Sequence, residues 1–141
     1  MLKKTITYVD YDNVERTEEF HFNLSKAELM EMNLGQSGGL LAVLTKITET
    51  QDIPKIMEQF KQIILKSYGE KSLDGKRFIK SPQMTEEFTQ TEAYSQLFME
   101  LSTNDMAAAA FIKGIVPSDI SAQLPDDPQK VKSLPSTNIK V

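Results

Sequence analysis

The spacing of hydrophobic residues changes once, near residue 25, and this change limits what the chain can fold into. In residues 2–9 (LKKTITYV) β-branched and apolar residues alternate with others, and in residues 15–22 (ERTEEFHF) Phe20 and Phe22 fall on one face. The DYDN stretch between the two segments consists of residues that are common in turns. A period of two that is interrupted by a turn predicts a β-hairpin with one face in solvent.

After the hairpin the pattern becomes helical. Ser25 followed by Glu28 is a capping-box sequence, which predicts a short helix over about 26–33. The glycines of LGQSGGL interrupt this helical pattern, and a second helix is predicted over about 40–50. Asp52 then predicts the cap of a longer helix that ends at Gly69 in a left-handed conformation. Its apolar residues recur at helical spacing, namely Ile53, Ile56, Met57, Phe60, Ile63 and Ile64.

The second half of the chain contains a turn and further helices. Asp74-Gly75 is a strong turn signal, and Ser81-Pro82 predicts the start of a helix because proline is tolerated in a first turn. The stretch TEAYSQLFMEL continues at helical spacing. Thr103 or Asn104 would cap the next helix, which ends near Gly114.

The sequence therefore predicts a mostly α fold in one domain, residues 1–124. It comprises an N-terminal β-hairpin (2–22) and a bundle of about five or six short helices (25–124), the last of them a turn near 118–124. After Leu124 the sequence has three prolines and few large apolar residues. We expect residues 125–141 to form a flexible tail.

Composition excludes several classes of function. The chain has no cysteine, which excludes disulfides, thiolate zinc sites and cysteine nucleophiles. A net charge of −4 provides no general attraction to nucleic acid or to anionic membrane. The start lacks the apolar run of a signal peptide, and no stretch is long enough to span a membrane. We expect an intracellular, soluble protein with no nucleic-acid partner and no membrane partner.

No catalytic or metal-binding pattern is visible. His21 is the only histidine, so a zinc site there would need carboxylates to complete it. The segment that begins at Asp10 resembles a calcium loop, but Glu15 stands where that loop requires glycine. After the last glycine of GQSGG come Leu40 and Leu41, where a phosphate-binding loop requires a lysine and a hydroxyl residue. We expect no enzymatic activity, no cofactor and no metal.

The methionines are the more suggestive feature, because methionine adapts to varied apolar partners. Filling of the core is the alternative for these residues. The methionines spread over the predicted helices are Met30, Met32, Met57, Met84, Met99 and Met106. Short helices, a glycine-rich joint and adaptable side chains favour a protein that holds an apolar partner in a groove.

The order of segments resembles a known family. The segments KKTITYVDYDNVERTEEFHFNLSKAELMEM, GGL, SYGEKSLDGKRFIK, FTQTEAYSQLFMEL and AAAAFIKGIVP look like the tail assembly chaperones of long-tailed, siphovirus-type bacteriophages and prophages. The resemblance covers about residues 3–120, and its most specific parts are SYGEKSLDGKRFIK and TEAYSQLFMEL.

The resemblance implies a small, mostly helical, non-enzymatic protein of the host bacterial cytoplasm. Such chaperones bind the long, hydrophobic tape measure protein, keep it soluble and promote assembly of the tail tube protein around it. They are absent from the mature virion. Helical spacing suggests which side chains would make the apolar contacts, although the same residues would suit a core: Met57, Phe60, Tyr94, Phe98 and Phe111.

Two alternatives to a chaperone follow from other features. The hairpin edge would suit a structural tail component, such as a tube or connector subunit that remains in the particle. Stoichiometric abundance in purified virions, measured by mass spectrometry, would favour that alternative. The basic segment 64–81 (ILKSYGEKSLDGKRFIKS) suggests a nucleic-acid-binding regulator, but no recognition-helix pattern accompanies its charge. The sequence leaves self-association and the oligomeric state open.

Overall fold

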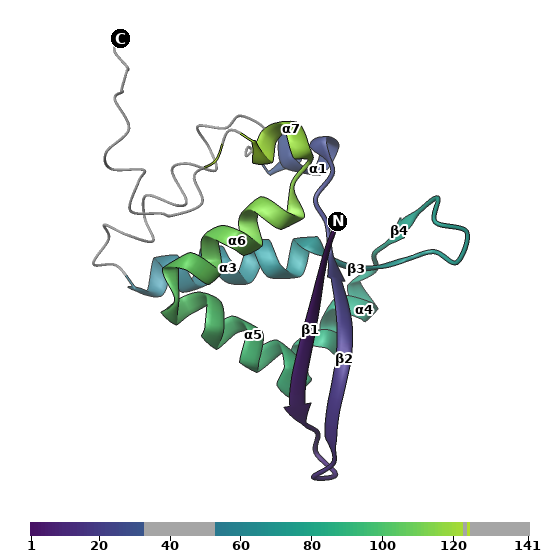
Figure 1. The fold of residues 1–141 in the computed structure, drawn as a ribbon, viewed down its shortest axis with the longest axis vertical. Helices are drawn as coiled ribbons and strands as arrows, with labels where there is room; N and C mark the ends of the chain where they lie inside the picture. The colour runs from purple at the N-terminus through teal and green to yellow at the C-terminus, as the bar shows by residue number, and fades with distance from the viewer. Residues whose placement is uncertain (33–52, 123, 125–141) are drawn as a thin grey trace.

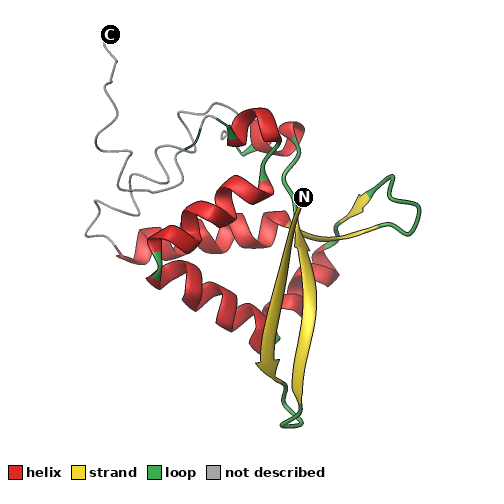
Figure 2. Ribbon diagram, viewed as in Figure 1, coloured by secondary structure: helices red, strands yellow, loops and turns green. Residues whose placement is uncertain are grey.

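A small antiparallel sheet and a layer of helices make up the fold. The computed structural model describes residues 1–32, 53–122 and 124. Within these residues most of the helices lie to one side of the two long N-terminal strands, and one short helix reaches past the strands on the other side (Figure 2). The helix predicted over about 40–50 and the tail predicted at 125–141 lie outside the described residues.

The chain begins with the predicted hairpin. Strand β1 (Leu2–Val9) pairs antiparallel with β2 (Glu15–Phe22) along the full length of both strands (Figure 1). Ile6 and Tyr8 of β1 are buried, whereas the residues between and beside them are exposed. The turn is closed by Asp10, whose carboxylate accepts hydrogen bonds from backbone N–H groups two and four residues later. The prediction of a hairpin with one face in solvent is confirmed.

The predicted capping box follows the hairpin. Ser25 Oγ accepts a hydrogen bond from the backbone N–H of Glu28 at 3.2 Å, and the Ser25 N–H donates to the Glu28 carboxylate at 2.9 Å. These reciprocal bonds start the short helix α1 (Lys26–Glu31), which buries Leu29.

The longest helix of the described residues runs directly into a strand. Helix α3 (Ile53–Ser67) is followed at once by β3 (Tyr68–Lys71). The predicted role of Gly69 as a left-handed helix cap is therefore wrong. Gly69 lies in β3 and pairs with His21 of β2. Its backbone does not have a positive φ, unlike that of Gly75.

Strand β4 (Phe78–Ile79) pairs antiparallel with β3, so the sheet has the order β1-β2-β3-β4. The predicted turn at Asp74-Gly75 joins β3 to β4, and Gly75 has a φ of 76°. The predicted fold class contained no strand after residue 22, and in this respect it needs correction. β3 has four residues and β4 has two, which is too short for an alternating pattern to be recognised in the sequence.

Two of the remaining helices start at caps that the sequence predicts, Ser81 and Asn104, and a third starts at Thr91, which was not predicted as a cap. The side chains of Ser81, Thr91 and Asn104 each accept a hydrogen bond from a backbone N–H three residues later. Asn104, rather than Thr103, is therefore the residue that caps the helix beginning at Asp105. The helices are α4 (Pro82–Thr89), α5 (Glu92–Thr103), α6 (Asp105–Ile115) and α7 (Ser118–Ser121).

The core forms where the inner face of the hairpin meets these helices. Phe22 is fully buried, and its ring lies 5.2 Å from that of Phe111 of α6 and 5.9 Å from that of Phe88 of α4, measured between centroids. The ring of Tyr68 stacks on Phe88 with centroids 4.2 Å apart. The last residue of β2 thus connects the sheet to the helices through aromatic contacts.

Candidate binding groove

An open groove with a volume of about 900 Å³ runs between α3 and α4. The apolar groups in its wall are Leu65, Pro82 and Tyr94, and lysines and glutamates form the polar part. Lysine side chains contribute hydrocarbon stems as well as charge to such a wall. The lining residues are Glu28, Lys61, Gln62, Leu65, Lys66, Lys80, Ser81, Pro82, Thr85, Glu86, Thr89 and Tyr94. An open groove with this mixed lining can hold a segment of chain that is apolar on one side.

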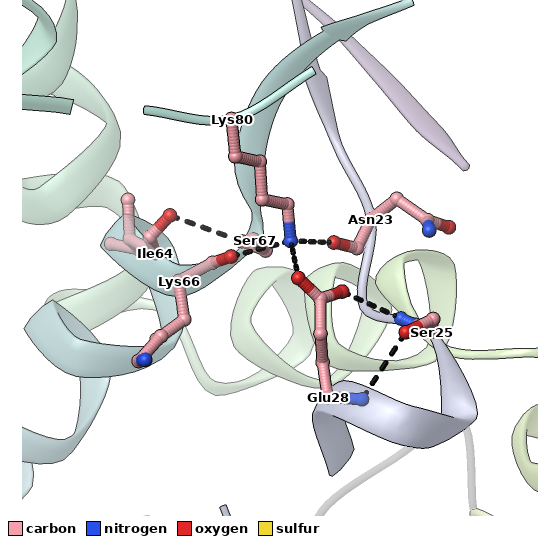
Figure 3. Close-up of polar contacts among 7 residues, drawn as sticks. All are labelled: Asn23, Ser25, Glu28, Ile64, Lys66, Ser67 and Lys80. Carbon is pink, nitrogen blue, oxygen red and sulfur yellow. Dashed lines mark hydrogen bonds and ion pairs between the residues drawn. The ribbon is translucent and has the colours of Figure 1, made fainter. Parts of the chain in front are cut away.

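Lys80 lines the groove and is held by three hydrogen bonds. Its ammonium group donates hydrogen bonds to the carbonyls of Asn23 and Lys66 and to the carboxylate of Glu28, at 2.7, 2.6 and 2.7 Å (Figure 3). These acceptors belong to the linker before α1, to the end of α3 and to α1 itself. One side chain therefore joins the end of α3 to the stretch from Asn23 to Glu28, which lies 52 to 57 residues before Lys80 in the sequence.

Glu28 is bound from two sides in this arrangement. Partial burial opposes ionisation of its carboxylate, but hydrogen bonds from Lys80 and Ser25 outweigh burial and lower the pKa of Glu28 below its ordinary value. One carboxylate oxygen accepts from the Ser25 N–H and the other from Lys80. Glu28 therefore completes the capping box of α1 and also binds α1 to Lys80 of the groove.

We expect replacement of Lys80 with methionine to lower the free energy of unfolding by about 2 kcal/mol at neutral pH. The variant keeps the apolar stem but leaves Glu28 and two carbonyls without their donor. The pKa of Glu28 is lowered in the folded state. Its contribution to the free energy of unfolding is therefore fully present above pH 4.5, its ordinary pKa, and is lost as the pH falls through the folded pKa. Denaturant unfolding of both proteins at neutral pH and at about pH 3 should show a smaller difference at the lower pH.

Lys26→Met is the matched control for this prediction. Lys26 also forms an ion pair, to Asp119 at 2.7 Å, but both side chains are mostly exposed. An exposed pair contributes little, so this variant should unfold almost as the wild type does. Equal losses for the Lys80 and Lys26 variants would contradict the anchoring role of Lys80.

The structure separates the five residues that helical spacing suggests for partner binding. Phe60 and Phe111 are buried in the core, so their side chains are not accessible in this conformation. Met57 is 37% exposed, and Tyr94 and Phe98 are half-buried. Of the five, only Tyr94 lines the groove, and its ring lies 6.0 Å from that of Phe98. The assignment of partner binding to these residues stays a prediction, with Met57, Tyr94 and Phe98 as its accessible members.

Most of the methionines that the sequence suggests are at the surface. Among the described residues, Met32 and Met84 are partly buried, and Met32 packs against the core. The others are large, exposed apolar groups at separate places on α1, α3, α5 and α6. They are Met30, Met57, Met99 and Met106. Core filling therefore accounts for only the smaller part of this set.

The sequence pattern did not identify Lys80, Gln62 or Leu65 as groove residues. Lys80 lies 52 residues from Glu28, and no local signal in the sequence connects the two. Leu65 follows the buried Ile64 directly, so it lies beside the predicted stripe and not in it. The capping box uses only one carboxylate oxygen of Glu28. The second oxygen, which can accept a bond from a cation, was the only indication in the sequence that a lysine would contact α1.

In the part of the chain that the structure describes, no three His, Asp or Glu side chains come together as metal ligands. No helix in residues 1–32, 53–122 and 124 has the length and apolar character required to cross a membrane. His21 is half-buried at the junction of β2 and β3, beside Gly69.

One of three comparisons with known proteins gives a match. Neither the curated proteins nor the solved structures provide a match to this chain. A family model described as phage tail assembly chaperone matches residues 1–139, which is nearly the whole sequence. This match covers the hairpin, the helices and every residue of the groove. The chain therefore belongs to the phage tail assembly chaperone family.

Proposed function

We propose that this chaperone binds the tape measure protein of its phage in the groove between α3 and α4, keeps it soluble and promotes assembly of the tail tube. The observation that carries the proposal is the groove itself, which is open and partly apolar. The proposed action needs no chemical step, so the protein would act as a binding protein and not as an enzyme. It would act in the host cytoplasm and be absent from the mature virion.

The lining of the groove suits a hydrophobic segment that must later be released. Leu65 and Tyr94 offer apolar contact, while Lys61 and Glu86 of the lining are exposed and charged. Partial burial and the nearby Glu58 carboxylate raise the pKa of Tyr94, so its phenol stays neutral at physiological pH. A groove whose edges stay exposed to solvent does not enclose its partner, so it binds the partner weakly enough to release it.

The exposed methionines support the same proposal. Met57 lies on α3, the helix that forms one wall of the groove, and Met99 lies on α5, which contacts α3. Methionine side chains are unbranched and adapt to apolar surfaces of different shape. A protein that must hold several segments of one long hydrophobic chain would benefit from such residues.

We expect Gln62→Trp to abolish this activity, because the indole would occupy part of the groove. Gln62 is exposed on α3 and lines the groove, so the folded core should tolerate the change. The measurement is the soluble fraction of the tape measure protein when it is co-expressed with wild type or variant. The soluble fraction should fall to the level found without the chaperone.

Gln83→Trp provides a closely matched control. Gln83 is exposed on α4 and donates a hydrogen bond to Glu87 at 3.1 Å, much as Gln62 donates to Glu58 at 2.9 Å. It does not line the groove. The Gln83 variant should therefore keep the tape measure protein soluble. If Gln62→Trp also does so, the groove is not the binding site.

A further inference from the structure

The hairpin formed by β3 and β4 extends away from the rest of the molecule (Figure 1). We call residues 70–79 the basic finger. It carries Lys71, Lys76 and Arg77, all exposed, and among the described residues none of these three side chains forms an ion pair. The tip also carries Leu73, which is fully exposed. A projecting element with an apolar tip and basic flanks is unusual in a chain whose net charge is −4.

The tip of the basic finger is ordered by its own hydrogen bonds. The Asp74 carboxylate accepts from the Ser72 hydroxyl at 2.6 Å and from the Lys76 N–H at 3.0 Å. Ser72 Oγ in turn accepts from the Arg77 N–H at 3.0 Å. These bonds use the Asp74 carboxylate within the turn, and they hold the backbone on both sides of Leu73 in one conformation.

The base of the basic finger is also fixed. Gly69 lies so close to Phe78 and Ile79 that a side chain would not fit between the strands. Lys80, which follows β4 directly, is bonded to the ends of α1 and α3 and lines the groove. The basic finger is therefore fixed next to a residue that lines the groove, and it does not depend on a partner to order it.

We propose that the basic finger is a second docking surface, which inserts Leu73 into an apolar pocket on an acidic face of a folded tail tube subunit. A preordered leucine on a fixed support suits a preformed pocket, whereas the adaptable methionines suit an extended chain. Lys71, Lys76 and Arg77 would face carboxylates around that pocket, giving electrostatic complementarity. The choice of a tail tube subunit rests on the proposed function.

A nucleic-acid partner is less consistent with these residues. The basic finger has three cations and two carboxylates, Glu70 and Asp74, so its net charge is +1. Binding to a phosphate backbone requires several cations without adjacent carboxylates, and it gives no role to an exposed leucine.

The test measures binding of the purified tail tube protein of the same phage to the full chain, by biolayer interferometry at low and at high salt. We expect Leu73→Ser to weaken binding by about tenfold, as for a central apolar contact. The triple variant Lys71→Glu, Lys76→Glu, Arg77→Glu should weaken binding further and remove the salt dependence that the wild type shows.

Val14→Ser is the control, because Val14 is an exposed apolar residue at the tip of the other hairpin. It should bind the tail tube protein as the wild type does. The proposal is overturned if the wild type does not bind the tail tube protein, or if both finger variants bind it unchanged. It is also overturned if the triple variant loses only the retardation of a short DNA duplex in a gel shift at low salt.

The docking role of the basic finger and the role of the groove can fail independently, and the experiments distinguish the two. The solubility of the tape measure protein depends on Gln62 and the groove, whereas binding of the tail tube protein depends on Leu73. If Leu73→Ser loses only binding of the tail tube protein and Gln62→Trp loses only solubility of the tape measure protein, both proposals are supported. If Gln62→Trp has no effect while Leu73→Ser weakens binding, only the groove assignment is wrong.

Discussion

Replacing Phe22 with alanine should lower the free energy of unfolding by about 4 kcal/mol, a large part of the roughly 5–15 kcal/mol that holds a domain of this size together. Phe22 is 0% exposed, and its ring contacts those of Tyr68, Phe88 and Phe111. The variant leaves a cavity where β2, β3, α4 and α6 meet. Urea unfolding followed by circular dichroism measures the loss.

Phe20→Ala is the matched control, two residues earlier on the same face of β2. Phe20 is half-buried, and among the described aromatic residues its ring contacts only that of Phe88, with centroids 5.4 Å apart. The loss should be roughly half of that for Phe22, since less apolar surface leaves the interior. A larger loss at Phe20 than at Phe22 would contradict the central position of Phe22.

The features that local chemistry determines could be predicted from the sequence. The hairpin of residues 2–22 shows alternation over two strands of eight residues, and the wet face needs no knowledge of the rest of the chain. Ser25, Ser81 and Asn104 start helices because a side-chain oxygen binds a backbone N–H three residues later. These interactions span a few residues, so the sequence displays them directly.

The central strands could not be predicted in the same way. A glycine before an Asp-Gly turn is compatible with a helix cap and with a strand that another strand approaches closely. The outcome depends on the pairing of Gly69 with His21, which is 48 positions earlier (69 − 21). Pairing at this distance in the sequence is decided by the packing of Phe22 and Tyr68 and not by local propensity.

The candidate site was predictable only in its general character. Helical spacing identifies Phe60 and Tyr94 as apolar positions, but it does not indicate that Phe60 faces the core while Tyr94 lines the groove. That difference depends on which neighbour covers each helix. Similarly, a cluster of lysines in residues 64–81 does not reveal that Lys80 is bonded internally while Lys71 and Lys76 stay exposed.

Replacing Gly69 with alanine should lower the free energy of unfolding by about 3 kcal/mol, because the added methyl group has no room. A Cβ at this position would lie 2.5 Å from Phe78 Cε2, 2.7 Å from the Ile79 carbonyl oxygen and 3.0 Å from Lys80 Cγ. The phenylalanine ring can rotate away, but the carbonyl belongs to the backbone of β4 and can move only with the strand. Thermal unfolding measures the loss.

Gly75→Ala separates this steric effect from the general effect of losing a glycine. A Cβ on Gly75 would meet nothing within 4 Å, but its φ of 76° is unfavourable for alanine, so the loss should be only about 1 kcal/mol. The two variants should also differ in binding. Moving β4 displaces the basic finger and Lys80 together, so Gly69→Ala should weaken binding of the tail tube protein and lower the solubility of the tape measure protein. Equal stability for the two glycine variants would show that β3 and β4 are not as closely apposed as the structure has them.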